Sequence, residues 1–258
     1  MSSDAPPADK PRPFAAPCHP LTIRAPLQWL SAGWRDWRAS PRASLAYGVS
    51  LFGLSALITV LAWKAGRYGL VVAMLSGFVF IAPLLATGLY SISRQLERGE
   101  RPSLSRSLRR MRMALRDALI FALALTVIFL VWVRAAFMLH VFFPVGVEEN
   151  LQALLTFLAI GSAVGSIFAA VVFAISAFSL PMIVDRDADM ITACVTSVNA
   201  VLRNKPAMLA WAACIVALTA LGFATAGLGL VVTLPLLGYA THHGYRQTID
   251  ASDWPASP

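Results

Sequence analysis

Charged residues are scarce in this sequence. Asp, Glu, Lys and Arg make up 13% of its 258 residues, whereas they account for about 25% of an average soluble domain. Apolar residues reach 58%, compared with roughly 45–50% in soluble domains. Such a chain has too few polar side chains to cover a folded core in water. The composition therefore excludes a water-soluble globular protein and indicates a polytopic membrane protein.

The sequence also lacks the signatures of familiar chemistry. Its three cysteines, Cys18, Cys194 and Cys214, have no C-x-x-C spacing, so neither a zinc site nor a disulfide framework is indicated. No phosphate loop, dinucleotide fingerprint, H-E-x-x-H or Ser-His-Asp arrangement is present. We therefore expect no enzymatic activity, no cofactor, and no catalytic or metal-binding residues. No nucleic-acid-binding module accompanies the net charge of +8, which favours contact with anionic lipid headgroups instead.

Long apolar runs dominate what is present. The longest one, residues 151–184, contains no charged side chain, and a helix of this length exceeds the roughly 30 Å hydrocarbon core of a bilayer. Gly161, Gly165 and Ala169 form a stripe of small residues along it, which favours close packing of another helix. Together, the apolar runs predict six membrane-spanning helices, at about 45–63, 68–93, 118–143, 151–184, 207–226 and 230–245.

Amphipathic segments lie between these runs. Apolar residues recur at helical spacing from Leu27 to Trp37, so this segment is expected either to lie on the membrane surface or to pack on the protein itself. A second amphipathic helix is expected at 104–115, with arginines beside its apolar face, and a third at 188–203.

The basic residues predict the orientation of the helices. Of the 21 Lys and Arg residues, eighteen fall in segments on one side of the membrane, and the loops on the other side contain only Lys64 and Arg67. By the positive-inside rule both termini are cytoplasmic. The expected fold is all-α, with six transmembrane helices in three hairpins and amphipathic helices on the cytoplasmic side. Residues 21–250 form this domain, between a disordered proline-rich tail, 1–20, and a C-terminal tail, 251–258.

Three prolines lie within the predicted spans and predict kinks. Pro83, Pro181 and Pro235 each lack the N–H that a helix needs, and each frees a backbone carbonyl that neighbouring helices must satisfy. Two of them share a local pattern, since Pro-Leu-Leu is followed eleven residues after the proline by Arg-Gln, at 94–95 and at 246–247. This similarity suggests that two of the hairpins have a common architecture.

Arg134 is the only arginine inside a predicted span. An ionisable residue at this depth is a functional candidate by default. Its distance from the start of the helix places it near the outer interface, where the side chain reaches towards Glu148 or Glu149. In the alternative interpretation Arg134 faces the interior of the bundle and contacts an anion.

Acidic residues gather where the fourth predicted span leaves the membrane. Asp185, Arg186 and Asp187 are followed by Asp189, at the start of an amphipathic helix. Such carboxylates typically cap a helix and complement its dipole, with Asp187 or Asp189 as the cap. The alternative is a metal or proton site, for which no second carboxylate cluster is evident.

The histidines allow a third kind of site. His140 lies near the outer end of its predicted helix, and the pair His242 and His243 lies near the inner end of another. Haem ligation by two histidines needs both at one depth, which this topology opposes. The simpler interpretation is that they are amphipathic residues at the membrane interface.

Several short stretches carry a resemblance to a known family. They are WLSAGWRD (29–36), SLAYG (44–48), APLL (82–85), LERGERPS (96–103), PMIVDRD (181–187), TS (196–197), NKP (204–206), PLLGYAT (235–241) and YR (245–246). On these stretches, which cover nearly everything after residue 20, the chain resembles an uncharacterised family of bacterial integral membrane proteins, a domain of unknown function. The resemblance implies a multi-pass protein of the bacterial inner membrane.

Some members of that family are labelled cytochrome c oxidase subunit I. That subunit needs more spans and more histidine ligands for its haems and copper than six predicted spans and four histidines provide. The label therefore does not fit this sequence. Relatives have a Trp-His pair before the Tyr-Arg, where this chain has His242 and His243, so any role of that position transfers to His243.

These observations favour a non-enzymatic accessory or scaffold module of a membrane complex or of the envelope. The alternative is a small-solute or lipid transporter whose kinked helices open a path, and a haem- or metal-binding membrane protein is third. The expected partners are a bilayer with anionic headgroups and either another membrane protein or a second copy of the chain. The candidate functional residues are Arg134, Asp185, Arg186, Asp187, His243 and Arg246. A polar cavity at mid-depth would favour transport, and a dry bundle with an apolar outer groove would favour a partner.

Overall fold

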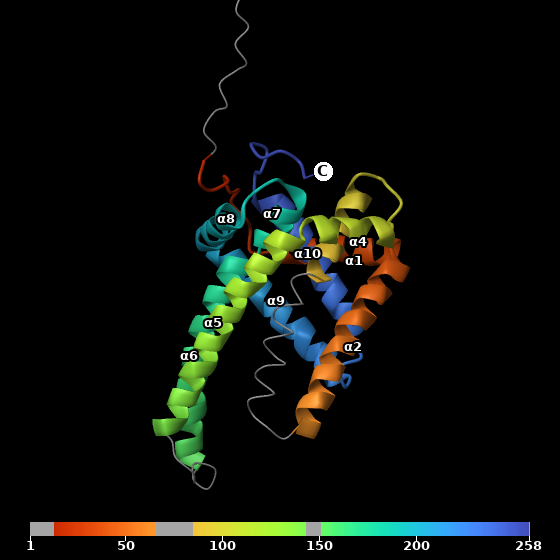
Figure 1. The fold of residues 1–258 in the computed structure, drawn as a ribbon. Coiled ribbons are helices and arrows are strands. Elements are labelled where there is room, and N and C mark those ends of the chain that lie inside the picture. The colour runs from red at the N-terminus through yellow and green to blue at the C-terminus, as the bar shows by residue number, and fades with distance from the viewer. Residues whose placement is uncertain (1–12, 66–84, 143–150, 258) are drawn as a thin grey trace, which may run out of the picture.

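The computed structural model describes residues 13–65, 85–142 and 151–257. Apart from two isolated bridges, the regular structure in these ranges is helical, which confirms the all-α class. The named helices are α1 (Ala25–Ala39), α2 (Pro41–Ala65), α4 (Leu104–Met113), α5 (Leu115–Phe142), α6 (Leu151–Ser176), α7 (Ser179–Asp185), α8 (Met190–Arg203), α9 (Lys205–Ala224) and α10 (Leu230–Thr248) (Figure 1). Residues 85–97 are also helical.

Four helical stretches in the described part are long and apolar enough to cross a membrane. They are Pro41–Leu61, Leu115–Met138, Leu151–Asp185 and Lys205–Ala224, and they match the predicted first, third, fourth and fifth spans. The predicted second span, 68–93, falls mostly outside the described residues. The predicted sixth corresponds to α10, which is not among these four helices. Several apolar helices of this length are what an integral membrane protein requires.

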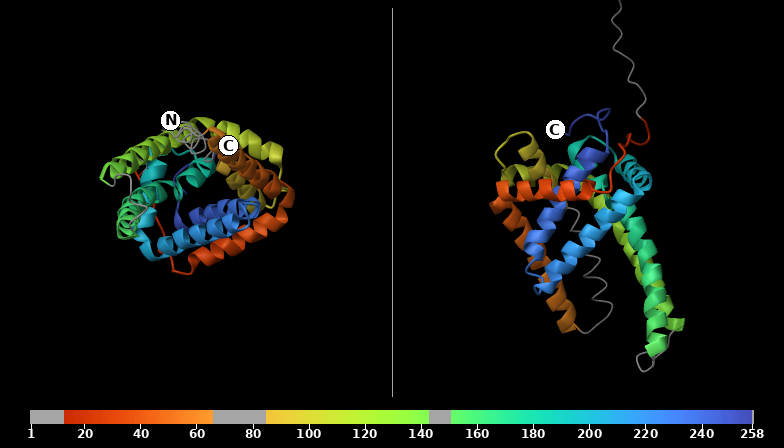
Figure 2. Two further views of the ribbon diagram at one scale, coloured as in Figure 1. Left: turned by 90° about the horizontal axis from the view of Figure 1, so that it is seen from below. Right: turned by 180° about the vertical axis from the view of Figure 1, so that it is seen from behind.

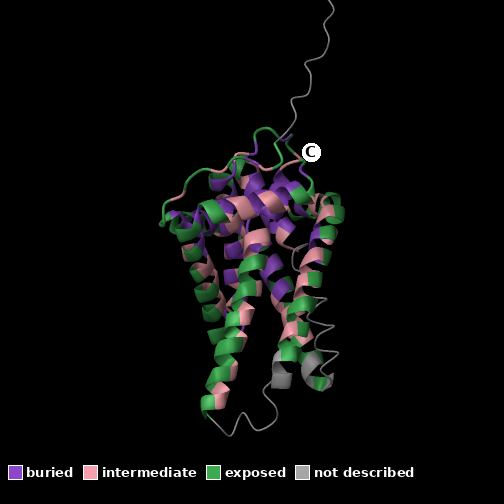
Figure 3. Cartoon of the chain, turned by 90° about the vertical axis from the view of Figure 1, so that its left-hand side faces the viewer, coloured by how far each residue is buried: buried purple, intermediate pink, exposed green. Residues whose placement is uncertain are grey.

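The helices form a layer at one end and long arms below it. Figure 1 shows α1, α4, α7 and α8 gathered at the end where the C-terminus lies; we call these four helices the cap layer. From there α2, α5, α6 and α9 extend away, and the right-hand view of Figure 2 shows α1 lying across the top of the arms. Buried residues concentrate at the cap end, whereas the far parts of the arms are mostly exposed (Figure 3).

A cluster of aromatic side chains holds α1 in the cap layer. Trp29 is 1% exposed and packs edge-on against Trp211 of α9 and Phe178, with ring centroids 5.5 Å and 6.1 Å away. Its indole N–H donates to the side-chain oxygen of Gln247. Large aromatic rings buried with their polar atoms satisfied contribute strongly to a core. Trp29 therefore ties α1 to α9, α10 and the start of α7.

A close approach of backbones adds to this contact. A Cβ atom at Gly33 would lie 2.8 Å from the backbone nitrogen of Ala240, so glycine is what lets α1 cross α10 at this distance. Leu27 and Trp34 of α1 remain exposed, at 62% and 38%. The sequence predicts that this helix lies either on the membrane surface or against the protein. One face packs on the protein, and the other face is exposed.

The proline inside α10 is matched by a glycine on α2. Because Pro235 has no N–H, the carbonyl of Val231 has no helical partner. A Cβ atom at Gly48 would lie only 2.0 Å from that carbonyl oxygen. Glycine thus lets α2 come close to the part of α10 whose hydrogen bond the proline removes.

The predicted fourth span is interrupted just before Pro181, where the sequence predicts a kink, although Leu151–Asp185 as a whole is long and apolar enough to cross a membrane. α6 ends at Ser176 and α7 begins at Ser179. In a continuous helix the ring of Pro181 would clash with the carbonyl of Ala177, four residues earlier. The nitrogen of Pro181 also has no hydrogen to donate to that carbonyl. At the break, the backbone N–H of Phe178 donates instead to Ser197 Oγ at 3.1 Å. Pro83, the third predicted kink, lies outside the described residues.

The predicted disordered tail is wrong over residues 13–20. Ala16 is fully buried, and its N–H donates to Thr196 Oγ1 at 3.0 Å. The N–H of His19 donates to the carbonyl of Thr248 at 2.8 Å. A proline-rich composition correctly indicates that this segment has no helix of its own, but other elements satisfy its backbone groups and hold it in place.

Candidate functional site

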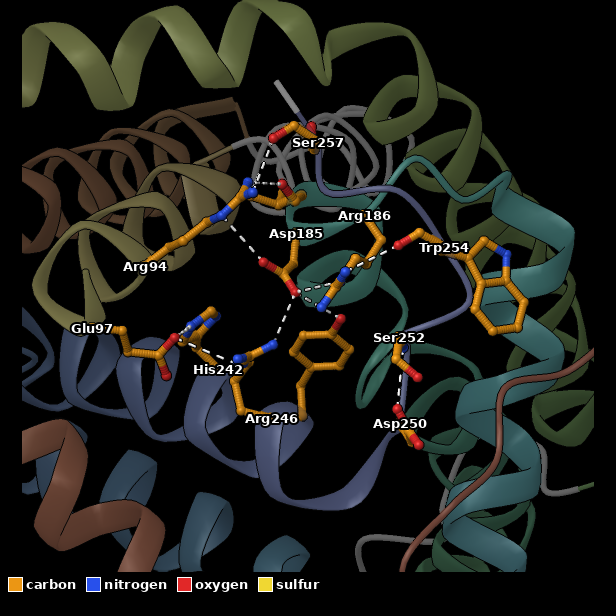
Figure 4. Close-up of polar contacts among 12 residues, drawn as sticks. Arg94, Glu97, Asp185, Arg186, His242, Arg246, Asp250, Ser252, Trp254 and Ser257 are labelled. Carbon is orange, nitrogen blue, oxygen red and sulfur yellow. Dashed lines mark hydrogen bonds and ion pairs between the residues drawn. The ribbon is translucent and has the colours of Figure 1, made fainter. Parts of the chain in front are cut away.

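Charged side chains converge at the cap end from four parts of the chain that are distant in sequence. Three of these parts, residues 85–97, the end of α7 and α10, are drawn in Figure 4, and Asp36 of α1 adds a fourth. We describe them as two groups that share one residue. The Asp185 group consists of Arg94, Asp185, Arg186, Tyr245 and Arg246. The Glu97 group consists of Asp36, Glu97, His242, His243 and Arg246.

Asp185 is the centre of the first group. Its carboxylate is buried, and Oδ1 lies 3.2 Å from Arg94 Nε. Oδ2 accepts from the hydroxyl of Tyr245 at 3.0 Å, and lies 3.2 Å from Arg186 Nε and 3.3 Å from Arg246 Nη1. A buried carboxylate is costly unless its charge is paired and its oxygens accept hydrogen bonds. Three guanidinium groups pair the charge, and Oδ2 accepts hydrogen bonds from Tyr245, Arg186 and Arg246.

Arg94 connects this carboxylate to the C-terminal segment. The residue is 3% exposed, its Nη1 donates to the carbonyl of Val184 at 3.1 Å, and its Nη2 donates to the carbonyl of Ser257 at 2.9 Å. Burial lowers the pKa of Arg94 to about 10, against the opposing effect of Asp185. The guanidinium is therefore still charged at neutral pH. It joins helical residues 85–97 to α7 and to the end of the chain.

The second group surrounds Glu97. Its Oε2 lies 3.4 Å from Nε2 of the buried His242 and 3.5 Å from Arg246 Nε. His243 Nδ1 lies 3.8 Å from the other oxygen, and His243 Nε2 lies 2.8 Å from Asp36 Oδ2. Burial raises the pKa of Glu97, but the neighbouring His242, Arg246 and His243 together lower it by more, so the net shift is downwards. Glu97 is thus held as a carboxylate.

Arg246 unites the two groups, because its Nη1 contacts Asp185 and its Nε contacts Glu97. The site as a whole is a ladder of alternating charges across the cap end. Most of its charged groups pair with one another, although His242 Nδ1 is buried without a hydrogen-bond partner among the described residues. Among the described residues no group of three or more His, Cys, Asp or Glu side chains could hold a metal ion. The chemistry that this arrangement supports is ionic attachment of helices.

The acidic residues at 185–189 have separate roles. Asp189 is the N-cap of α8, where Oδ1 accepts from the N–H of Thr192 at 2.9 Å, which confirms the capping prediction for this residue. Asp187 is exposed, and its N–H donates to the carbonyl of Pro255. Asp185 belongs to the buried ion pairs and takes no part in the cap. Arg186 joins the same group and also donates to the carbonyl of Trp254 at 3.0 Å.

The other sequence candidates lie elsewhere. Arg134 is exposed on α5, and its suggested partners at 148 and 149 fall outside the described residues. On α6, Gly161 and Gly165 are half-buried and Ala169 is exposed. A Cβ atom at Gly165 would meet only Trp132 Nε1 of α5, at 3.7 Å. His140 lies in α5, but its side chain is outside the described part.

Sequence analysis missed Arg94, Glu97 and Asp36 as members of the site. One signal pointed to Arg94, because it stands at the same distance from Pro83 as Arg246 stands from Pro235. These two arginines both contact Asp185. The pattern therefore marked two arginines that contact the same carboxylate.

Comparison with known proteins gives one match. No curated protein and no solved structure matches the chain. The part of the chain that matches a family model, residues 70–185, contains Arg94, Glu97 and Asp185, whereas α10 lies outside it. The resemblance to an uncharacterised membrane protein family is confirmed over that range: residues 70–185 match the family described as "Predicted integral membrane protein (DUF2189)", a domain of unknown function.

Proposed function

We propose that this chain is a non-enzymatic protein of the bacterial inner membrane, with six spans in three hairpins and both termini in the cytoplasm. The four apolar helices and the amphipathic cap layer support this arrangement, as does the excess of Lys and Arg in the segments assigned to the cytoplasmic side. In Figure 1 the red segment before α1 and the C-terminus both lie at the cap end.

Reporter fusions test this topology directly. A reporter after Arg106 should be active in the cytoplasm, and one after Glu149 should be active outside it. Activity of both fusions in the same compartment would contradict the proposed arrangement.

Within this topology the chain acts as an accessory module that binds a transmembrane helix of another membrane protein. The observation that supports this best is that α6, 26 residues long, has no buried residue. Its small residues leave room for a close helix contact, which is how helices associate where lipid provides no hydrophobic driving force. The views in Figures 1 and 2 show the α5–α6 pair standing apart from α2 and α9.

The polar site supports this role over transport. A transporter needs charged or polar groups that a solute can reach near the middle of the membrane. Asp185 instead contacts three arginines at the cap end, and Arg134 is exposed on α5. The ion pairs of Asp185 and the exposure of Arg134 thus support an attachment role more than a transport path.

A photo-crosslinking residue at Ser166, exposed on α6, tests the partner contact in native membranes. We expect one discrete adduct with another membrane protein, and we expect Ala169→Trp, one turn away, to abolish it. The matched control is Leu57→Trp on exposed α2, which should leave the adduct unchanged. An adduct of twice the chain's own mass would identify a second copy, and an adduct insensitive to Ala169→Trp would remove α6 as the contact.

A further inference from the structure

A cavity of about 170 Å³ lies beside the Asp185 group, between the α4–α5 junction, the end of α7 and the C-terminal segment. Arg110, Asp117, Arg186 and Asp187 contribute its charged lining, and Ala114 and Val184 belong to its apolar wall. The smallest cavities that hold a water are roughly 10–15 Å³. This one therefore has room for a phosphate group and its ester oxygens.

Arg110 has hydrogen-bonding capacity to spare. It is half-buried, and the contact that the described residues give it is a long one, from Nη1 to the carbonyl of Ser257 at 3.4 Å. Burial lowers the pKa of Arg110, Arg98 and Arg106 lower it further, and Glu100 and Asp185 oppose this shift without reversing it. A guanidinium that is partly desolvated among like charges is stabilised by an anion, and its planar donors match the oxygens of a phosphate.

Arg186 presents a second guanidinium to the cavity in a fixed position. Its Nε pairs with Asp185 at 3.2 Å, and its Nη1 donates to the carbonyl of Trp254 at 3.0 Å. These contacts hold the side chain from two sides. An anion entering the cavity thus meets one arginine that is free to adjust and one that is already oriented, which reduces the entropy cost of binding.

The position of the cavity identifies the source of the anion. The apolar stretch Leu115–Met138 begins at the cavity, and the arginine-rich α4 precedes it with Leu104 and Leu108 exposed. An arginine-rich amphipathic helix joined to the start of a span lies at the level of the lipid headgroups. Basic pockets at this level typically bind anionic phospholipids.

The two carboxylates that line the cavity limit which anionic phospholipids it can bind. Asp117 and Asp187 would repel a headgroup that carries only phosphate, but they can accept hydrogen bonds from hydroxyl groups. We propose that the cavity binds an anionic phospholipid with a hydroxylated headgroup, its phosphate held by Arg110 and Arg186 and its hydroxyls by Asp117 and Asp187. This site is independent of the partner contact proposed for α6.

The test uses the full chain in detergent and dihexanoyl phosphatidylglycerol as the probe, with bound lipid measured by native mass spectrometry. Arg110→Gln should weaken binding by about tenfold or more, because a charge-assisted hydrogen bond is lost. The matched control is Arg109→Gln, an exposed neighbour that does not line the cavity, which should change binding by less than about twofold. Ala114→Leu fills the cavity while every charge remains, and it should weaken binding like Arg110→Gln.

Equal effects of Arg109→Gln and Arg110→Gln would overturn the proposal, since binding would then be general electrostatics. Equal binding of dihexanoyl phosphatidylcholine would also overturn it, because that lipid has neither net charge nor a headgroup hydroxyl. Inorganic phosphate that displaces the lipid at similar concentrations would assign the cavity to a soluble anion instead. Melting temperatures without lipid check the fold, and if Arg110→Gln fails to fold, the result with Ala114→Leu decides.

Discussion

The cap end and the α5–α6 pair differ in how far their apolar side chains are buried. Trp29, Trp211 and Tyr245 at the cap end are at most 1% exposed. α6 is more apolar than the amphipathic helices of the cap layer, yet it has no buried residue. In a bilayer an apolar side chain gains little by leaving lipid for protein, whereas a charged one must find a partner. Specific packing is therefore found where the charges are.

The largest effect should come from removing the central charge of the cap end. Asp185→Asn leaves three arginines without their shared carboxylate, and breaking a buried ion pair in this way costs about 3–5 kcal/mol. The free energy of unfolding in detergent micelles measures it. Asp187→Asn, an exposed change two residues away, should stay within about 0.5 kcal/mol. Similar losses of unfolding free energy in both variants would show that the buried charge at Asp185 does not stabilise the cap end more than an exposed one.

A second pair of variants tests backbone packing on α2. Gly48→Ala places a Cβ atom 2.0 Å from the carbonyl of Val231, and overpacking of this kind costs about 1–3 kcal/mol. Gly53→Ala on the same helix meets nothing within 4 Å and should be neutral or slightly stabilising. Thermal unfolding of both variants in one detergent gives the difference. An unchanged Gly48→Ala protein would show that α2 and α10 do not approach as described.

The Glu97 group predicts a dependence on pH. The folded pKa of Glu97 lies below its ordinary value of 4.5, so its contribution to stability is complete above 4.5 and is lost as the pH falls through the folded pKa. The melting temperature of the wild type should drop over that range, and Glu97→Gln should drop less. Glu100→Gln, which removes a carboxylate paired with Arg106 at the surface, should follow the wild type. Parallel curves for all three proteins would argue against the shift.

The smallest effect is expected on α6. Ile167 is 64% exposed, so Ile167→Ala should change the free energy of unfolding by less than about 0.5 kcal/mol. Ile183→Ala, the same substitution at a buried position of α7, should cost about 2–5 kcal/mol. Denaturant titration of both variants sharpens the contrast between the two regions. A large loss from Ile167→Ala would reveal packing on α6 that the single chain does not contain.

Much of the fold could be predicted because it is local in sequence. Runs of apolar residues set the long helices, amphipathic spacing set α1, α4 and α8, and Pro181 marked the position of the break between α6 and α7. Each of these follows from a few neighbouring residues. The order of elements along the chain therefore agrees with the prediction wherever the structure describes it.

The site could be predicted only in part, because its contacts join distant residues. Asp185 and Arg246 were candidates, but the pairing of Arg94 with Asp185 joins residues 91 positions apart, and composition gives no information about which charges meet. Residues 13–20 were misjudged for the same reason. Their backbone partners, such as Thr196 and Thr248, lie on α8 and α10, so a segment with no structure of its own is held by the rest of the chain.

The contacts of Asp185 also impose an order on biosynthesis. Arg94 precedes Asp185 in the chain, so these two can meet as soon as α7 has left the ribosome. Arg246 and Ser257 follow only after α9 and α10 have been made. The ion pairs of Asp185 are therefore completed only after α10 has been made, and until then Asp185 has fewer positively charged partners than in the folded structure.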